Sequence, residues 1–316
     1  MSDSVIYDNI FEAIRALDKN NIVLSALGGR SGGVIRRQNY ITLKLPDGKY
    51  GFFLNSLSLQ FFRGESQVFD HCKPSLYRIV DKGDRVIAQL RAIEFISFLK
   101  TFPDLSKAEE DGRYIDYKAL AQHYGFATDM LDLTNDILTA AYFAIHVFDP
   151  YTNNTAVAGE GTGQIRYTTL LPEPDGRLHM IGMQPLARPG LQSAYGMILT
   201  EDEDFASMSN IVRFKQDPDK NMLFHSLFLQ GNDLFFPNEG VVAAAEKIKY
   251  APAITSMTIH KYCEEKKADV AKIRKLVTDK DLYIVDAPLV CNNMPFDKTD
   301  VMPSGAKNLR PIMIIG

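Results

Sequence analysis

The stretch Phe62-Arg63-Gly64-Glu65 places an arginine between aromatic residues and a glycine, a setting in which a guanidinium can do chemistry. Such an arginine binds a carboxylate or a phosphate through two parallel hydrogen bonds, or it forms one half of a partly buried ion pair. Residues 57–62 are mostly apolar and predict a buried strand, and Gly64 permits the chain to turn away at its end. Arg63 is therefore expected at the mouth of a cleft, with both roles open.

Asp132 is a second candidate, because it lies in the apolar run Met-Leu-Asp-Leu and its carboxylate should be buried. A buried carboxylate must be paired or hydrogen-bonded, and Arg63 or Arg78 is the expected partner. An ion pair of this kind accounts for both motifs without catalysis, and a bound ligand accounts for them equally well.

Other polar residues also have a structural alternative to a functional role. His123 follows Gln122 at a predicted helix end, where an imidazole is more often a structural group or a helix-terminal cation than a catalyst. Thr134 can cap the next helix, and Gln192 can bridge neighbouring strands. The aromatic residues that can belong to the core, with satisfied hydroxyl groups, are Tyr77, Tyr124 and Tyr142.

The composition favours a soluble globular protein. The 316 residues are 46% hydrophobic and 23% charged, and a formal net charge of -4 provides no general positive field for nucleic acid. No window of about eighteen uncharged apolar residues occurs and no secretory pattern opens the sequence, so we expect a cytoplasmic protein without a membrane span. The scattered cysteines, Cys72, Cys263 and Cys291, predict free thiols and no metal site.

Apolar periodicity and turn residues predict the elements that position these side chains. Helices are expected at residues 6–17, 86–100, 117–124, 137–148, 241–249 and 259–276. The helix at 137–148 is apolar almost all round and should be central. Strands are expected at 40–45 and 50–55, as a hairpin around Pro46-Asp47-Gly48, and at 164–171, 191–199, 282–289 and 312–315.

Several segments are expected to lack regular structure. The glycine-rich residues 28–33 do not have the spacing of a phosphate-binding loop and predict a flexible turn. The charged residues 104–113 predict a surface loop, and residues 201–204 predict a solvated acidic tip without calcium-loop spacing. Residues 153–163 are rich in Gly, Thr and Asn, so we expect a mobile loop that can close over the cleft as a lid.

Four patches follow one another in the order and spacing of a known family. They are Phe62-Arg63-Gly64-Glu65, Pro74-Ser75-Leu76-Tyr77-Arg78, residues 121–134 from Ala-Gln-His-Tyr-Gly to Leu-Asp-Leu-Thr, and Ala140-Ala141-Tyr142-Phe143-Ala144. In this arrangement the chain resembles the FRG domain family, a prokaryotic family named for its Phe-Arg-Gly motif. Further matches are Arg188 with Gln192, Ala194 and Tyr195, and the segment 229–237.

The resemblance implies three regions. Residues 57–248 would form the FRG domain, residues 1–56 an amino-terminal helix and hairpin, and residues 249–316 a carboxy-terminal α/β extension packed on the same core. The sequence departs from the family pattern Thr-Arg-Leu-Leu-Asp-Trp-Thr, because Asp129 replaces the arginine, Met130 the first leucine and Leu133 the tryptophan. If that arginine holds an anion in relatives, this chain binds a different ligand or uses Arg63, Arg78 or Arg188.

A strand that ends in aromatic-Arg-Gly is also similar to the first catalytic motif of the arginine-type ADP-ribosyltransferases, whose arginine holds the pyrophosphate of NAD. This similarity implies catalytic roles for Arg63, for Thr134 or Thr128, and for Gln192. Because glutamine cannot act as a general base, Glu65 or Glu239 would supply the carboxylate. The expected ligand-binding residues are Arg63, Glu65, Arg78, His123, Tyr124, Thr128, Asp132 and Arg188.

We therefore expect an α+β fold, with a twisted and mainly antiparallel sheet like that of an ADP-ribosyltransferase and with helices packed on it. The leading hypothesis is a protein that binds an anionic, nucleotide-like ligand such as NAD beside Arg63. It would act as an NAD-dependent ADP-ribosyltransferase, with a protein as target, or as an NAD glycohydrolase. The alternatives are a non-catalytic sensor or partner-binding module, and a nucleic-acid-linked protein of a defence or mobile-element system.

Overall fold

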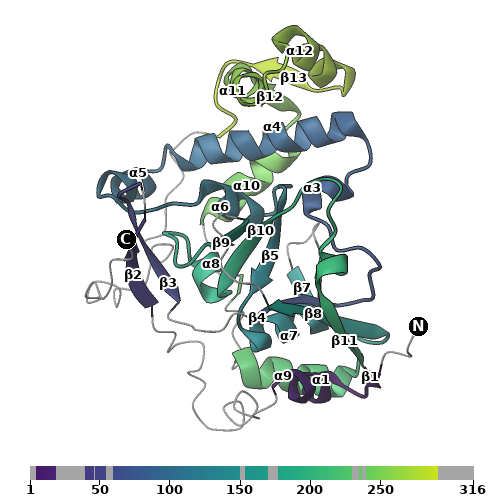
Figure 1. Ribbon diagram of the computed structural model, residues 1–316. Helices are drawn as coiled ribbons and strands as arrows, with labels where there is room; N and C mark the ends of the chain where they lie inside the picture. Colours follow the sequence, from purple (N-terminus) through teal and green to yellow (C-terminus); the bar gives the residue numbers. More distant parts are fainter. Residues whose placement is uncertain are drawn as a thin grey trace.

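The computed structural model shows an α+β fold built around a twisted seven-stranded sheet (Figure 1). It describes residues 5–18, 40–45, 47–54, 60–149, 154–169, 177–229, 235–236 and 240–290. The strand order is β1-β11-β8-β4-β5-β10-β9, and every pair is antiparallel except β1 with β11. The strands are β1 (Ile6–Tyr7), β4 (Gln60–Glu65), β5 (Met130–Thr134), β8 (Thr162–Thr169), β9 (Leu178–Met180), β10 (Ala194–Ile198) and β11 (Asn210–Lys215).

One face of the sheet is covered by the helices α1 (Ile10–Leu17), α7 (Ile137–Ile145) and α9 (Pro218–Leu229), at the bottom of Figure 1. Their apolar side chains form one core with Phe62 of β4 and Ile165 of β8. Helix α7 is buried along most of its length, as its uniformly apolar sequence predicts. Helix α1 begins after Asn9, whose side chain accepts hydrogen bonds from the backbone of Phe11 and Glu12, so residues 6–7 are a strand and not the predicted first turn.

Gly64 lies inside β4 and faces α7, so the prediction that it turns the chain away from the strand is wrong. A Cβ atom at this position would lie 1.8 Å from the carbonyl oxygen of Ala140 and 2.7 Å from the backbone nitrogen of Ala144. No side chain fits at such a distance, because it is far inside van der Waals contact. The glycine of the Phe-Arg-Gly motif thus allows the central helix to approach the central strand.

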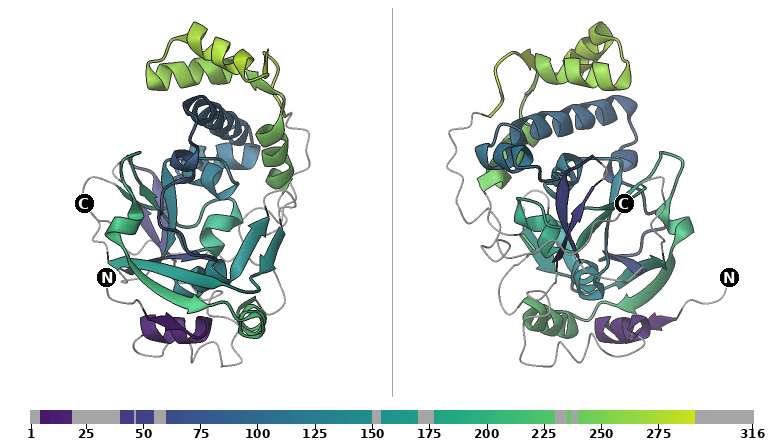
Figure 2. Two further views of the ribbon diagram at one scale, coloured as in Figure 1. Left: turned by 90° about the vertical axis from the view of Figure 1, so that its right-hand side faces the viewer. Right: turned by 60° about the vertical axis from the view of Figure 1, so that its left-hand side comes forward.

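A second set of helices comprises α3 (Ser75–Arg78), α4 (Lys82–Leu99), α5 (Pro103–Glu110), α6 (Tyr117–His123), α8 (Ala187–Leu191) and α10 (Gly240–Tyr250). Helix α4 has apolar residues on two sides. Phe95 and Leu99 pack in a core with α6 and α10, whereas Leu90 packs against the carboxy-terminal elements. These elements stack beyond α4 in all three ribbon views (Figure 2) and are β12 (Ala253–Thr255), α11 (Ser256–Lys266), α12 (Val270–Asp279) and β13 (Tyr283–Val285).

The predicted hairpin forms, with β2 (Tyr40–Lys44) paired to β3 (Tyr50–Leu54), but it is a separate sheet and does not extend the main one. Residues 153–163 were expected to form a mobile loop, yet β7 (Asn154–Val157) pairs with β6 (His146–Asp149), and β8 begins at Thr162. Period-two alternation is hard to recognise when Gly, Thr and Asn occupy a strand, because these residues are weak β-formers or polar.

Three further differences concern element ends. Residues 104–113 are mostly helical as α5, because Pro103 occupies its first turn, where proline is favourable. The predicted helix 259–276 is divided into α11 and α12 at Lys267, whose φ of 52° is left-handed. Strand β10 begins at Ala194, since α8 and Gln192 precede it. The segments 28–33 and 312–315 lie outside the described residues.

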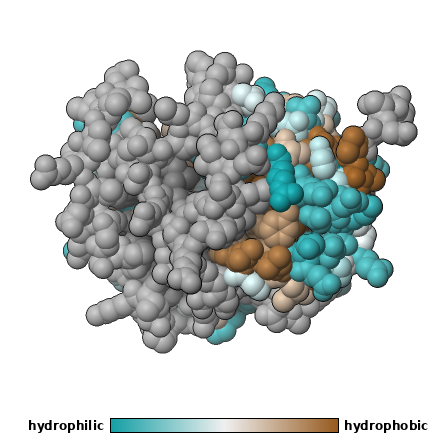
Figure 3. All heavy atoms as spheres, turned by 90° about the horizontal axis from the view of Figure 1, so that it is seen from below, coloured by the Kyte–Doolittle hydropathy of each residue, from teal (hydrophilic) through white to brown (hydrophobic). Residues whose placement is uncertain are grey.

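The underside of the molecule carries apolar groups next to polar ones on its described part (Figure 3). Helix α9 directs Phe224 and Phe228 into the core and leaves Met222, Leu223 and Leu227 exposed. The 3₁₀ helix η2 (Phe205–Met208) contributes Phe205 to the core on the other face of the sheet. Among the described helices, none combines the length and the hydropathy needed to cross a membrane.

Candidate functional site

The site forms where strands β4 and β5 separate. Within the described residues, the register of the two strands contains one pair, Phe62 opposite Thr134. Beyond it, Arg63 bridges the widening gap, because its Nη1 atom donates to the backbone carbonyl oxygen of Asp132 at 2.9 Å. A side chain therefore occupies the place of the next backbone hydrogen bond, and the two strands open into a pocket.

Glu65 lies behind Arg63 and does not line this pocket. Its Oε1 atom is 3.5 Å from Nε of Arg63, and its Oε2 atom is 2.9 Å from Nε of Arg166 on β8. Gln164 also donates to Oε2, at 2.6 Å. Arg166 is 1% exposed, so Glu65 is a buried carboxylate shared by two arginines, and the prediction that it contacts the ligand is not supported by its position.

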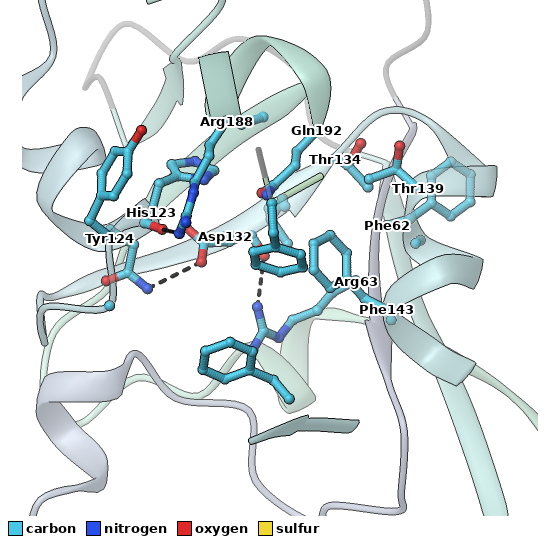
Figure 4. A pocket seen from close by; sticks show the side chains of 18 of the residues that line it. Phe62, Arg63, His123, Tyr124, Asp132, Thr134, Thr139, Phe143, Arg188 and Gln192 are labelled. Carbon is cyan, nitrogen blue, oxygen red and sulfur yellow. Dashed lines mark hydrogen bonds between the residues drawn. The ribbon is translucent and has the colours of Figure 1, made fainter. Parts of the chain in front are cut away.

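The pocket has a volume of about 610 Å³ and is lined by residues from both strands and from α3, α6, α7, α8 and α10 (Figure 4). We call it the arginine pocket. Of the candidates predicted from the sequence, those on its lining are Arg63, Arg78, His123, Tyr124, Asp132, Thr134, Arg188 and Gln192. Thr128 does not line it, and Glu239 lies outside the described residues.

The charged groups of the described lining are mostly basic. They are Arg63, Arg78, Arg188 and Lys249, with Asp132 as the acidic member. Arg78 is exposed and forms no ion pair with any of the described carboxylates, whereas Lys249 also pairs with Glu246 at 3.1 Å. A concave surface with this balance of charges attracts anions, since the surrounding protein screens the field less than water does.

Arg188 is held between two aromatic rings. Its guanidinium carbon lies 4.6 Å from the ring centre of Tyr124 and 5.4 Å from that of Phe236, and Nη1 donates to the carbonyl oxygen of His123 at 3.3 Å. Cation-π contacts of this kind orient an arginine without neutralising its charge. These contacts fix the position of the Arg188 guanidinium in the pocket.

Two basic groups of the pocket have pKa values below their usual range. Arg78 is exposed as a residue but lies on the pocket wall, and desolvation by that wall, followed by the positive charge of Arg63, lowers its pKa. Burial also lowers the pKa of His123, against the opposing effect of the Asp132 carboxylate, so the imidazole is neutral at pH 7. Burial is the largest cause of both shifts, and the positive charge of Arg63 adds to it at Arg78.

The predicted catalytic side chains make hydrogen bonds to the backbone. Oγ1 of Thr134 accepts from the backbone nitrogen of Asp136 at 3.1 Å, and Asp136, not Thr134, caps α7. Nε2 of Gln192 donates to the carbonyl oxygen of Phe235 at 3.1 Å. Both residues line the pocket, yet these bonds give each of them a structural role as well.

Asp129, which replaces the arginine of the family pattern, points elsewhere. It forms an ion pair with Lys118 and does not line the arginine pocket. The loss of that arginine therefore leaves the basic lining of the pocket intact.

Cys72 does not line the pocket either, and burial raises the pKa of its thiol to about 11, which disfavours a nucleophilic thiolate.

Two functional candidates, Lys249 and Arg166, were not predicted from the sequence. Lys249 lies one residue beyond the predicted end of the FRG domain and resembles any lysine in the last turn of a helix. Arg166 carried a clearer signal, since it interrupts the strand sequence Gln-Ile-Arg-Tyr, where a charged residue must be paired if it is buried. In the described residues, no group of three or more His, Cys, Asp or Glu residues is placed to hold a metal ion.

The antiparallel sheet, the close contact of β4 with α7 and the pocket at the strand gap define a mixed α/β protein whose central motif is Phe-Arg-Gly. Residues 58–152 match the family model of the FRG domain, and the chain therefore contains an FRG domain. No curated protein and no solved structure matches the chain. The extension of the domain to residue 248 stays a prediction.

Proposed function

We propose that the protein binds an anionic, nucleotide-like ligand in the arginine pocket. The observation that carries this proposal is the convergence of Arg63, Arg78 and Arg188 on one concave surface that holds a single carboxylate among its described residues. Arginine is suited to this role because its planar guanidinium forms paired hydrogen bonds with phosphate and stays charged at every physiological pH.

The size and the aromatic lining favour a nucleotide over a simple anion. A volume of about 610 Å³ lies in the range of pockets for small organic ligands, and an inorganic phosphate would fill little of it. Aromatic side chains provide flat faces on which a base can stack. Those on the lining are Phe62, Tyr124, Phe143, Phe148, Phe236 and Tyr250.

The finer proposal is that this ligand is NAD and that the pocket transfers or hydrolyses its ADP-ribose group. Breaking the bond between ribose and nicotinamide develops positive charge on the ribose, which a nearby carboxylate stabilises. Glu65 is paired behind Arg63, so Asp132 is the carboxylate available on the described lining. The finer proposal therefore assigns to Asp132 the carboxylate role that the sequence predicted for Glu65 or Glu239, and it is supported by the chemistry of this carboxylate.

A thermal-shift series tests the proposal. A ligand that binds only the folded protein stabilises it by mass action, so the melting temperature rises with the concentration of the ligand and with its affinity. We expect ADP-ribose, NAD and ATP to raise the melting temperature, and uncharged adenosine to leave it unchanged. An equal shift with adenosine, or no shift with any of the three anionic nucleotides, contradicts the proposal. Release of nicotinamide from NAD, measured by chromatography, tests the finer proposal separately.

A further inference from the structure

The two carboxylate oxygens of Asp132 differ in their hydrogen bonds among the described residues. Its Oδ2 atom accepts a hydrogen bond from Nε2 of Gln122 at 3.2 Å. Its Oδ1 atom is buried and has no hydrogen-bond partner among the described residues. Burying an unpaired carboxylate oxygen is unfavourable, and such an atom in a pocket indicates a missing donor.

The orientation of this carboxylate is fixed from behind. Oε1 of Gln122 accepts from Oγ1 of Thr128 at 2.6 Å and from Oγ of Ser75 at 3.4 Å. The amide oxygen therefore faces these two hydroxyl groups, and the amide nitrogen must face Asp132. Thr128, which the sequence placed in the ligand site, acts on the pocket through Gln122 and keeps Oδ1 of Asp132 free for another donor.

The basic residues of the pocket do not supply that donor. Arg63 donates to the backbone carbonyl of Asp132 and pairs with Glu65, and no ion pair joins Asp132 to any described basic residue. A cationic ligand group is also a poor candidate, since the positive charges of Arg63, Arg78 and Arg188 would repel it. The remaining class of donor is neutral, either a hydroxyl or an amine attached to a ring.

We propose that Asp132 is the specificity-determining residue of the arginine pocket, and that Oδ1 accepts a hydrogen bond from a neutral donor of the bound nucleotide. This inference rests on the proposed anion site. It predicts that the pocket selects a nucleotide over the bare polyphosphate chain, because the polyphosphate brings no neutral donor and its charge is repelled by Asp132. The donor is a ribose hydroxyl or the exocyclic amine of the base.

Asp132→Asn changes this preference in a defined way. Because Gln122 donates to the side chain at position 132, the asparagine places its oxygen toward Gln122 and its amide nitrogen toward the ligand. The acceptor in the pocket becomes a donor and the negative charge is lost. Affinity for polyphosphate should rise while the contact to a neutral donor weakens, so the two ligands respond in opposite directions.

Titration calorimetry with ATP and with tripolyphosphate measures the selectivity. We expect the wild-type protein to prefer ATP by about tenfold or more, and Asp132→Asn to lose this preference. Asp129→Asn is the matched control, since Asp129 is three residues away, pairs with Lys118 and does not line the pocket. Asp129→Asn should keep the wild-type ratio of ATP to tripolyphosphate affinity. If removing any nearby carboxylate changed the selectivity, this control would change the ratio as well.

Analogues identify the donor. Loss of affinity with 2′-deoxy-ATP or 3′-deoxy-ATP, seen in the wild-type protein and absent in Asp132→Asn, assigns the donor to the ribose. The same pattern with inosine triphosphate assigns it to the base amine. An unchanged ratio of ATP to tripolyphosphate affinity in Asp132→Asn overturns the inference and leaves the anion site in place. Full affinity of the wild-type protein for all three analogues has the same consequence. If neither ATP nor tripolyphosphate binds, the proposed function fails and the inference fails with it.

Discussion

The side chain of Arg63 contacts the backbone of Asp132 and not its carboxylate. Nη1 of Arg63 donates to the carbonyl oxygen of Asp132 at 2.9 Å, whereas the Asp132 carboxylate accepts a hydrogen bond from Gln122. The predicted ion pair between Arg63 or Arg78 and the Asp132 side chain does not form among the described residues. The carboxylate that balances Arg63 is Glu65, at 3.5 Å, and Glu65 is also bound to Arg166 at 2.9 Å. The buried charge is therefore shared, and the two arginines contribute differently.

Arg166→Met should destabilise the protein more than Arg63→Met. Arg166 is fully buried and makes the shorter contact with Glu65, so its removal leaves a poorly compensated carboxylate and should cost about 3 kcal/mol. The side chain of Arg63 is 22% exposed. When Arg63 is replaced, Glu65 is still paired with Arg166, so we expect a loss of stability of about 1 kcal/mol. Urea unfolding of both variants measures the two values. The reverse order would show that Arg63 is the principal structural partner of Glu65.

Gly64→Ala should be severely destabilising. The added Cβ would lie 1.8 Å from the Ala140 carbonyl oxygen, so β4 and α7 must move apart, at an expected cost of about 3 kcal/mol. The matched control is Gly159→Ala, where a Cβ atom meets nothing within 4 Å and the change should stay within about 0.5 kcal/mol. Similar unfolding midpoints for the two variants would mean that the close contact of β4 with α7 is not required.

His146 should make the protein less stable at acidic pH. Its ring stacks on Tyr142, its Nε2 atom lies 2.9 Å from Nδ1 of His225, and burial lowers its pKa from 6.5 to about 4. As the pH falls below 6.5 the unfolded chain takes up a proton that the folded protein does not bind. Stability is therefore lost progressively between pH 6.5 and about pH 4, to a total of about 3 kcal/mol.

His146→Gln keeps the hydrogen-bonding capacity of this position without the titration. The free energy of unfolding of this variant should fall less than that of the wild-type protein between pH 7 and pH 4, by about 3 kcal/mol. His260→Gln, the same change at an exposed position on α11, should follow the wild-type curve. Parallel pH profiles for His146→Gln and the wild-type protein would contradict this account.

The sequence predicted those features that depend on local patterns. The helix at Tyr117–His123, with Gly125 after it at a φ of 82°, follows from apolar spacing and a left-handed glycine, and the Phe-Arg-Gly motif identified the FRG domain. It also selected most of the polar residues of the pocket, because polar groups within apolar runs must find partners.

The partners themselves could not be predicted, since they depend on register and on contacts far apart in the sequence. The pairing of β4 with β8 places Arg63 opposite Arg166 and Glu65 opposite Gln164. This register decides that Glu65 contacts Arg166 and not a ligand. The role of Gly64 depends equally on the approach of α7 to its strand. A one-residue change of register would have exchanged the faces of the strand and reversed both assignments.

The most direct test of the anion site is titration calorimetry with ADP-ribose on Arg78→Ala and Arg274→Ala. Arg78 is an exposed lining residue with no ion pair to a described carboxylate, and Arg274 is exposed on α12 away from the pocket, so neither change should disturb folding. If the arginine pocket holds the ligand, Arg78→Ala weakens binding about tenfold or more and Arg274→Ala leaves it unchanged. Equal affinities for the two variants, or no binding of ADP-ribose to the wild-type protein, would contradict the account.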